Sequence, residues 1–239
     1  MSGRSSRAGT CPVRLLHWQR GFWLSAGLSA SLSVSAALGG AGAAFQARPT
    51  ALLYARVYHD RSRLFSHYSH DHVIHAATYQ SEIRFDPAAP EHCFAQLRIP
   101  VASLLVDEPS LRGRLGIPGT LAESDRKTVR EHLLAEDQLD ASRHAQIEIL
   151  VQSCVGSATS GQYRADVTVT IRGKAQKRAQ AALIHFQGGR LRTSGSLRFR
   201  HADFGMQPYS AWLGAVSNLE PIDLLWSLEA DPAGTSVPR

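Results

Sequence analysis

Residues 190–206 read Arg-Leu-Arg-Thr-Ser-Gly-Ser-Leu-Arg-Phe-Arg-His-Ala-Asp-Phe-Gly-Met, and the first eleven of them decide the fold. Every second side chain is apolar or small, and arginine or serine stands at the positions between. A period of two places these two sets on opposite faces of an extended strand, one facing an interior and one facing water. The inward set is Leu191, Thr193, Gly195, Leu197 and Phe199.

The same alternation recurs along the chain and predicts a series of antiparallel strands. Residues 163–172 show it most regularly, and Gly188-Gly189 indicates a tight hairpin just before residue 190. Connections of hairpin length favour an all-β, up-and-down meander that closes on itself. The expected strands are residues 54–58, 62–67, 70–85, 94–105, 147–155, 163–172, 181–187, 190–200 and 221–230.

One helix is expected in a long connection between two strands. Residues 106–119 are rich in glycine and proline and predict a loop. Thr120-Leu121-Ala122-Glu123 then matches a capping box, which predicts a helix over residues 121–139. Its apolar stripe is modest, so we expect this helix to cover one end of the barrel.

The first 43 residues have the pattern of an export signal. Four arginines and no acidic residue accompany a long uncharged stretch, and Ala41-Gly42-Ala43 fits the small-x-small cleavage rule. We expect cleavage there, with an uncleaved anchor as the alternative, and a periplasmic or secreted protein. The expected domains are a leader at 1–43, a linker at 44–52, the barrel at 53–231 and a flexible tail at 232–239.

Removing the leader changes the charge balance and the cysteine count. Of 26 basic and 20 acidic residues, 22 and 20 remain, so the net charge falls from +6 to +2 and no nucleic-acid footprint is left. Cys11 leaves with the leader. Cys93 and Cys154 lie at the start of the strand before the helix and at the end of the strand after it. Antiparallel pairing of those strands would bring the two together, which suggests a disulfide.

Several short motifs stand in an order known from one protein family. Ile83-Arg84-Phe85-Asp86-Pro87 is similar to its G-x-I-x-F-D-P, with Ser81 where glycine is usual. Val169-Thr170-Ile171-Arg172-Gly173 is similar to L-T-I-R-G. Asp203-Phe204-Gly205-Met206, followed by Ala215-Val216-Ser217-Asn218, is similar to D-F-G-x … a-V-g-D. Over roughly residues 54–230, the chain therefore resembles the YceI-like family of exported, lipocalin-like barrels.

The resemblance implies an eight-stranded antiparallel barrel whose long apolar pore binds a polyisoprenoid, such as a quinone tail or a polyprenyl lipid. From its place in the turn at residues 203–205, we expect Phe204 to plug the barrel or border the ligand. Tyr209, Trp212 and the turn around His70 are expected near a mouth, where a head group would lie. The register of residues 181–187 stays open, because Leu183 and Ile184 are both apolar. The expected pore lining is Phe85, Leu97, Ile99, Val167, Val169, Ile184, Leu197, Phe199, Leu224 and Trp226.

A metal-binding or redox-linked exported protein is the main alternative. His70 and His72 share one face of an extended segment, as in H-x-H metal sites. A third ligand would come from His59, Glu82 or His201. The simpler interpretation is a polar entry to a strand at the barrel mouth, in which the carboxylate between the two histidines binds local backbone donors. A solid barrel that acts only as an interaction module is a third alternative.

Enzyme motifs are not apparent in the sequence. There is no G-x-S-x-G, and Asp203-Phe204-Gly205 lacks the other kinase motifs, so we predict no catalytic residues and no cofactor. The expected partner is an isoprenoid lipid and not a nucleic acid. A homodimer and transient contact with a membrane are left open.

Overall fold

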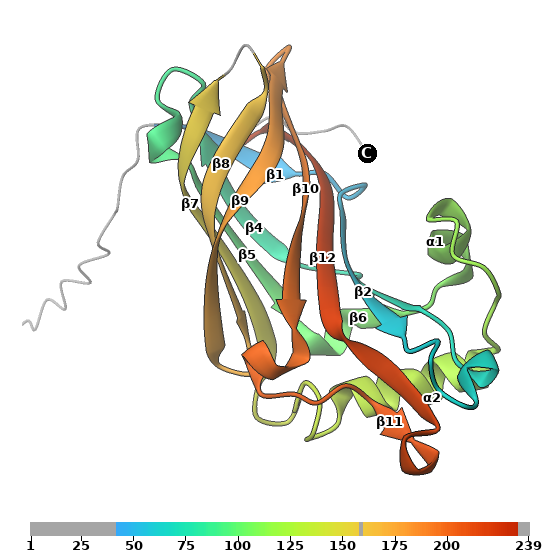
Figure 1. The fold of residues 1–239 in the computed structure, drawn as a ribbon. Coiled ribbons are helices and arrows are strands. Elements are labelled where there is room, and N and C mark those ends of the chain that lie inside the picture. The colour runs from blue at the N-terminus through green and yellow to red at the C-terminus, as the bar shows by residue number, and fades with distance from the viewer. Residues whose placement is uncertain (1–41, 158–159, 234–239) are drawn as a thin grey trace, which may run out of the picture. The chain divides into compact units, whose positions relative to one another are not determined.

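The computed structural model describes residues 42–157 and 160–233 (Figure 1). Its strands are β1 (Ala43–Ala47), β2 (Leu52–His59), β3 (His72–Ala76), β4 (Gln80–Phe85), β5 (Phe94–Pro100), β6 (Leu104–Val106), β7 (Gln146–Ser157), β8 (Gln162–Ile171), β9 (Lys174–Gln187), β10 (Arg190–Arg200), β11 (Ser210–Ala211) and β12 (Val216–Pro232). The helices are α1 (Pro109–Arg114) and α2 (Glu123–Leu134). Five short 3₁₀ turns are η1 (Ser66–Tyr68), η2 (Pro90–His92), η3 (Val101–Ser103), η4 (His201–Phe204) and η5 (Trp212–Gly214).

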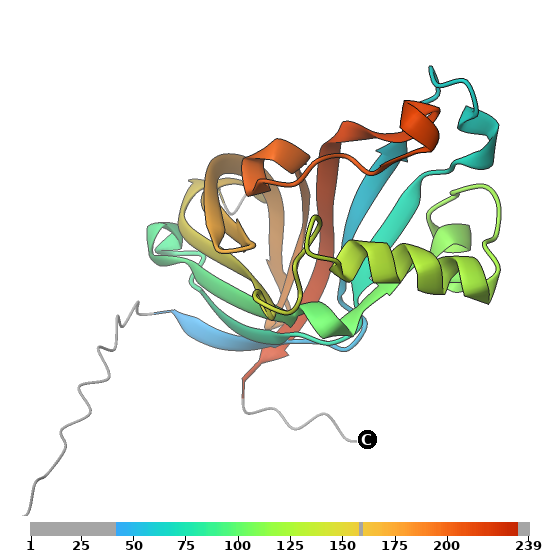
Figure 2. The ribbon, with the colours of Figure 1, turned by 90° about the horizontal axis from the view of Figure 1, so that it is seen from below.

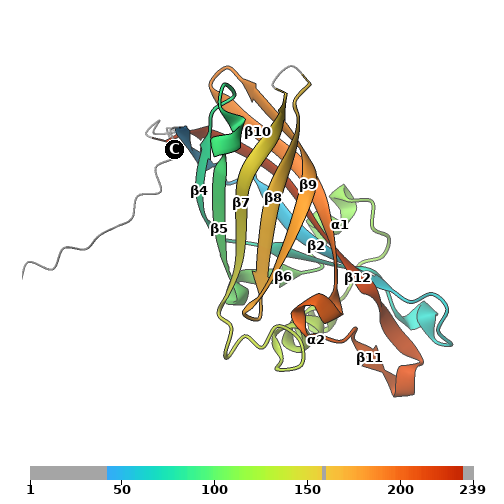
Figure 3. The ribbon, with the colours of Figure 1, turned by 60° about the vertical axis from the view of Figure 1, so that its left-hand side comes forward.

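Eight antiparallel strands close into a barrel. The order is β1-β4-β5-β7-β8-β9-β10-β12, and β12 pairs back onto β1, so that Phe45 lies opposite both Ile83 and Pro232. Figure 2 shows the closed ring from below, and Figure 3 shows β4, β5, β7, β8 and β9 side by side. The predicted eight-stranded, lipocalin-like barrel is confirmed, and residues 190–200 form β10 with the bounds that the sequence predicted.

The chain runs along the molecule three times before β7, and each of these passes is divided into two strands: β1 and β2, β3 and β4, and β5 and β6. The halves β1, β4 and β5 belong to the ring, whereas β2, β3 and β6 continue from β12 as a sheet at the lower end in Figure 1. Helix α2 lies at this lower end, and its Val129, Leu133 and Leu134 pack against the core. A helix thus covers one end of the barrel, as expected.

Local sequence explains the most regular elements. Along β8 the inward side chains from Tyr163 to Ile171 are buried, while the alternate ones are more exposed. Between β9 and β10, Gly188 and Gly189 have φ of 59° and 76°, which glycine adopts without a steric penalty. The alternation and this turn together set the register of the hairpin.

Four expectations about strands need correction. Residues 94–105 are not one strand, because the 3₁₀ turn η3 divides them into β5 and β6. Residues 62–67 are not a strand: the carboxylate of Asp60 accepts hydrogen bonds from Ser62 and Arg63, and the resulting turn runs into η1. Residues 70–85 break into β3 and β4, because the N–H of Ala77 turns to the carbonyl of Ser103. Residues 44–52, expected to be a linker, include most of β1.

The long connection also differs in detail. Residues 106–119, expected to be a loop, contain α1, which begins at Pro109 and buries Arg112. Helix α2 begins at Glu123 with Ala122 as its N-cap and has no capping side chain, so the predicted capping box at Thr120 does not form. The helix ends at Leu134, not at 139, and β9 begins well before residue 181.

Most of the predicted leader and tail lie outside the described residues. Within the ranges that the structure describes, no helix has the length and apolar character needed to cross a bilayer.

Candidate functional site

The upper half of the barrel encloses an apolar cavity of about 110 Å³, here called the upper chamber. Its wall consists of inward side chains of β4, β5, β7, β8, β9, β10 and β12. Apolar atoms make up almost all of the lining. Representative lining residues, one from each of these strands in turn, are Phe85, Leu97, Val151, Val167, Ala182, Leu197 and Trp226.

A second apolar cavity of about 110 Å³, the lower chamber, lies toward α2. Leu133 of α2, Leu139 in the following turn, Met206 and His201 close it at the lower end. The remaining lining includes Ile99, Leu104, Ile147, Ile171 and Ile222 from the strands.

The two chambers meet at a common wall. Leu53, Ile149 and Leu224 line both cavities, so the two chambers lie next to each other. Leucine and isoleucine side chains change rotamer more easily than the backbone of a barrel moves. The two neighbouring chambers are together called the pore.

The structure places most of the predicted pore residues along this pore. Ile99 faces the lower chamber, and the exposed position of Leu183 settles the register of β9, with Ile184 inward. Phe199 and Phe204 do not line either chamber: their rings pack 5.3 Å apart, almost fully buried, at the lower end of β10. The predicted residues that line the upper chamber are Phe85, Leu97, Val167, Val169, Ile184, Leu197, Leu224 and Trp226.

Small side chains in the pore wall were missed by the sequence analysis. Ala165, Ala182 and Ala230 line the upper chamber, and their short side chains leave its space open. In the sequence these residues are alanines at inward positions of strands. Such alanines are also typical of a tightly packed core, so they do not by themselves indicate a cavity. Leu139 and Met206 were missed because they lie outside the strands.

A smaller cavity of about 90 Å³, the mouth, adjoins the lower chamber. Val57, Ile74, Leu133, Gln138 and His201 line both cavities, so the lower chamber and the mouth lie next to each other. The mouth adds polar groups, from His72, His132, Tyr209 and Asn218. The sequence analysis expected Tyr209, Trp212 and the turn around His70 near a mouth; Tyr209 lines this cavity with its ring stacked on His132 at 5.0 Å, whereas Trp212 and His70 do not line it.

His201 stands at the boundary between the lower chamber and the mouth. Its side chain is almost fully buried, and Nδ1 lies 2.9 Å from the carbonyl oxygen of Glu220. A carbonyl only accepts, so Nδ1 carries the proton and Nε2 is left as an acceptor. Burial lowers the pKa of His201, against the smaller raising effects of that hydrogen bond and the charge of Glu220. The imidazole is therefore neutral at pH 7.

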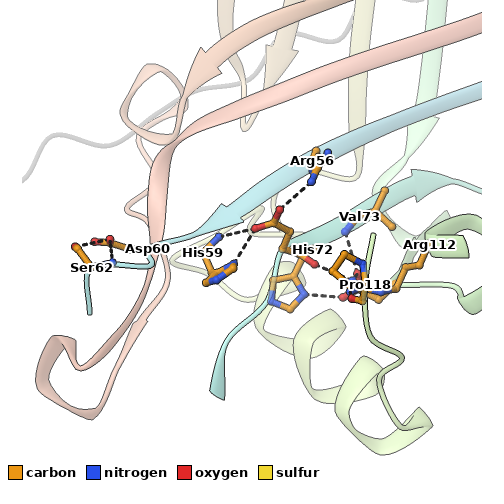
Figure 4. A network of polar contacts seen from close by, with 10 residues as sticks. Arg56, His59, Asp60, Ser62, His72, Val73, Arg112 and Pro118 are labelled. Atoms are coloured by element: carbon orange, nitrogen blue, oxygen red, sulfur yellow. Dashed lines mark hydrogen bonds and ion pairs between the residues drawn. The ribbon is translucent and has the colours of Figure 1, made fainter. Parts of the chain in front are cut away.

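Beside the mouth, two buried carboxylates, Asp71 and Asp107, organise the turn that carries the histidines. Figure 4 labels their partners Arg56, His59, His72 and Arg112. Asp71 accepts hydrogen bonds from Arg56 at 2.9 Å and from the backbone N–H of His59 at 3.2 Å. Asp107 lies 2.6 Å from Nδ1 of His72 and accepts from Arg112 at 2.6 Å. These contacts fix the histidine-bearing turn to β2 and to the loop before α1.

The electrostatics of Asp107 follow from its partners. Burial alone would raise its pKa, but hydrogen bonds from His72, the Val73 N–H and Arg112 outweigh burial and hold the pKa of Asp107 below its ordinary range. Arg112 also donates to the carbonyls of Asp71, Pro118 and Gly119. The charged groups of Asp107 and Arg112 are therefore paired with each other and with backbone groups of the surrounding loops.

The residues of the metal alternative do not gather into a site. The rings of His70 and His72 lie 5.8 Å apart, but Nδ1 of His72 faces Asp107 and Nδ1 of His59 lies 2.8 Å from Asp71. Glu82 is on β4 and is paired with Arg84. Among residues 42–157 and 160–233, no three His, Cys, Asp or Glu side chains are placed to hold a metal ion.

Cys93 and Cys154 form a disulfide, with their Cα atoms 5.6 Å apart. It joins the start of β5 to the upper part of β7, where the strand order suggested that the two would meet. Both residues line the upper chamber.

Comparison with known proteins agrees with this architecture. A family model for the YceI-like domain matches residues 57–227. BcnA of Burkholderia cenocepacia is similar in structure, with a TM-score of 0.55, 17% identity, and 75% of this chain and 95% of that chain covered. A polyisoprenoid binding domain from Saccharophagus degradans has a TM-score of 0.52 and 8% identity, with 80% of this chain and 99% of that chain covered.

Among curated protein sequences, no relative matches the chain. The low identities to the two solved structures show a shared fold alone. The family model covers well over half of the sequence. The chain therefore belongs to the YceI-like domain family.

Proposed function

We propose that this protein binds a long-chain isoprenoid lipid of the quinone or polyprenyl type, without catalysis, and stores or transports it. The observation that carries the proposal is the apolar pore, whose lower chamber adjoins a mouth with several polar groups in its wall. Each CH₂ group moved from water into such a pore contributes about 0.8 kcal/mol. A long apolar tail with one polar end matches this division of the interior.

The chemistry of the mouth supports an uncharged head group. Its described lining offers imidazole, phenol and amide groups and contains no lysine or arginine. Phosphate-binding sites normally use such cations or a cluster of backbone N–H groups. Nε2 of His201 would accept a hydrogen bond from a hydroxyl group. We therefore propose a prenol, quinol or quinone in preference to a prenyl phosphate.

Export is part of the same proposal. The predicted leader and the disulfide Cys93–Cys154 are both typical of an oxidising compartment outside the cytoplasm, either the periplasm or the medium. Cell fractionation with antibody detection would test it, and a chain found in the cytoplasm with two free thiols would contradict it.

Native mass spectrometry tests the binding proposal. The protein released from detergent should carry an added mass that organic extraction identifies as an isoprenoid lipid. Ala182→Trp places an indole in the upper chamber and should abolish the added mass. Ala181→Trp is the matched control, since the adjacent side chain of β9 points to solvent, and it should retain the lipid. Equal retention by both variants, or a bare mass for wild type, would contradict the proposal.

A further inference from the structure

Two loops at the lower end of the barrel carry a group of exposed apolar side chains, here called the apolar tip. It consists of Leu64, Phe65, Tyr68, Trp212 and Leu213. The first three lie between β2 and β3, and the last two lie between β11 and β12. Both loops project at the lower end in Figures 1 and 3.

Contacts between aromatic rings and backbone hydrogen bonds hold the apolar tip together. The ring of Trp212 packs edge-on against Phe65 and Tyr68, with centroids 6.0 and 5.9 Å away. Backbone hydrogen bonds join the two loops, from the N–H of Phe65 to the carbonyl of Ala215 and from the N–H of Asp60 to the carbonyl of Ser217. Side chains from distant parts of the chain are thus held together on the surface.

The backbone holds the apolar groups outward. Trp212 and Leu213 have φ of 50° and 55°, a left-handed conformation that is strained for bulky residues. The side chain of Leu213 is as exposed as in an extended peptide, and Leu64 is 78% exposed. A strained backbone that holds a leucine side chain fully exposed to water indicates that this side chain is buried in an apolar environment outside the protein.

The size and composition of the tip fit a bilayer better than a second protein. A stable protein interface uses about 20–30 residues a side, whereas the tip offers five apolar side chains. Tryptophan and tyrosine favour the head-group level of a membrane, and leucine favours the acyl region below it.

Charge is also compatible with a membrane. The loop of residues 60–71 contains two arginines and two aspartates, and residues 209–219 contain no charged side chain. Asp60 is paired with Arg63, its Oδ2 lying 2.8 Å from Nε, and Asp71 is paired with Arg56 of β2 at 2.9 Å. Both carboxylates in the segments that carry the tip are therefore neutralised by arginine, so neither presents an unpaired negative charge to anionic lipid head groups.

The tip is adjacent to the mouth. Tyr209 and Asn218 line the mouth, and the N–H of Asn218 donates to the carbonyl of Tyr209. Only the two residues of β11 separate Tyr209 from Trp212. We propose that the apolar tip inserts into the interfacial layer of a phospholipid bilayer and holds the mouth against the membrane from which the lipid enters. Lipid entry rests on the proposed function, whereas insertion does not.

Tryptophan fluorescence on vesicles tests insertion in the full chain. The vesicles contain phosphatidylethanolamine and phosphatidylglycerol, with or without brominated acyl chains. The signal of Trp212 is the difference between wild type and Trp212→Phe, so it reports the tip whatever else binds the membrane. We expect a shift to shorter wavelength and quenching by the brominated lipids. An unshifted and unquenched Trp212 would overturn the proposal.

A matched pair of variants tests the energetics. Leu213→Asp should weaken vesicle binding about tenfold or more, whereas Leu183→Asp, an exposed leucine on the outer face of β9, should bind as wild type does. Thermal unfolding should be unchanged for Leu213→Asp. Equal binding by both variants would overturn the proposal. So would a wild-type dimer that Leu213→Asp dissociates, because a second copy would then cover the tip.

The proposed lipid binding and the proposed membrane insertion can be refuted independently of each other. Leu213→Asp should bind a prenol from detergent solution as wild type does, yet take it up more slowly from vesicles. Quenching of Trp212 without any prenol binding would refute the proposed function and leave insertion intact. Prenol binding with equal uptake by both proteins would refute the role of the tip.

Discussion

Trp226 lies flat across the inner face of β10 because the residue opposite it is Gly195. The two are cross-strand partners, and a Cβ built on Gly195 would stand 2.2 Å from the indole ring. The indole N–H donates to the hydroxyl of Thr193 at 3.2 Å, which holds the ring in this position. In the sequence Gly195 was simply a small inward residue, and nothing there showed which ring it accommodates.

Gly195→Ala should push the indole of Trp226 into the upper chamber. Overpacking of this kind costs about 1–3 kcal/mol, so we expect a lower free energy of unfolding in urea and weaker binding of a prenol. Ser194→Ala on the same strand is the control, because it adds no volume. Unchanged stability and unchanged binding in Gly195→Ala would contradict the assigned packing.

Burial of His201 predicts a dependence of stability on pH. Its folded pKa lies below the value of about 6.5 in the unfolded chain. Its stabilising contribution is therefore fully present above pH 6.5 and is lost as the pH falls from there toward the folded pKa. His201→Gln should show a flatter decline in free energy of unfolding between pH 7.5 and 5.5. His92→Gln, on the exposed turn η2, should keep the wild-type slope. A wild-type slope in His201→Gln would refute this.

At the scale of elements, α1 shows what the sequence could not reveal. Six residues with a proline and a glycine predict a loop, yet they form a helix because Arg112 inserts between the chain segments around it. Its guanidinium is 1% exposed and binds one carboxylate and three carbonyls. The helix depends on contacts with residues up to 41 positions away, which local sequence patterns do not report.

Arg112→Met should leave Asp107 charged and poorly paired in the interior. Removing one partner of a buried ion pair costs about 3–5 kcal/mol, so the midpoint of urea unfolding should fall clearly. Arg114→Met is the matched control on the same helix, where the side chain is exposed, and should change stability by less than about 0.5 kcal/mol. Similar midpoints for the two variants would show that the network contributes little.

Strand boundaries were predicted best where one strand is paired along its whole length. β8 pairs with β9 and β10 pairs with β12 without interruption, and the bounds of β8 and β10 agree with the alternation to within one residue. The second and third passes break in the middle because the upper halves join the ring and the lower halves join the sheet beside β2. Such a change of partner leaves the alternation intact, so the sequence cannot mark it.

At the scale of the whole molecule, closure of the barrel depends on five residues. β1 fills the gap between β4 and β12, and its Phe45 is buried against the core with its ring 6.0 Å from Phe186. Without β1, both neighbouring strands would present unpaired edges. The sequence analysis assigned most of this stretch to a linker because five residues are too few to establish a period of two.

Phe45→Ala should therefore destabilise the barrel as a whole, by about 3–5 kcal/mol. Hydrogen exchange should show increased opening along β4 and β12, the two strands that β1 joins. Gln46→Ala, whose side chain faces solvent, should leave both stability and exchange unchanged. Greater exchange confined to β1 itself would mean that the barrel stays closed without it.

The sequence by itself determined which side of most strands faces inward, with β9 as the exception, and it determined the hairpin at Gly188-Gly189 and the antiparallel connectivity. These depend on local alternation, turn chemistry and short connections, all of which are written within a few residues. Only the tertiary structure decided that the inward face of β10 is divided, with Leu197 on an open chamber and Phe199 packed against Phe204. Whether an inward side chain meets a neighbour or empty space depends on residues from strands across the barrel, and those meet only when the ring closes.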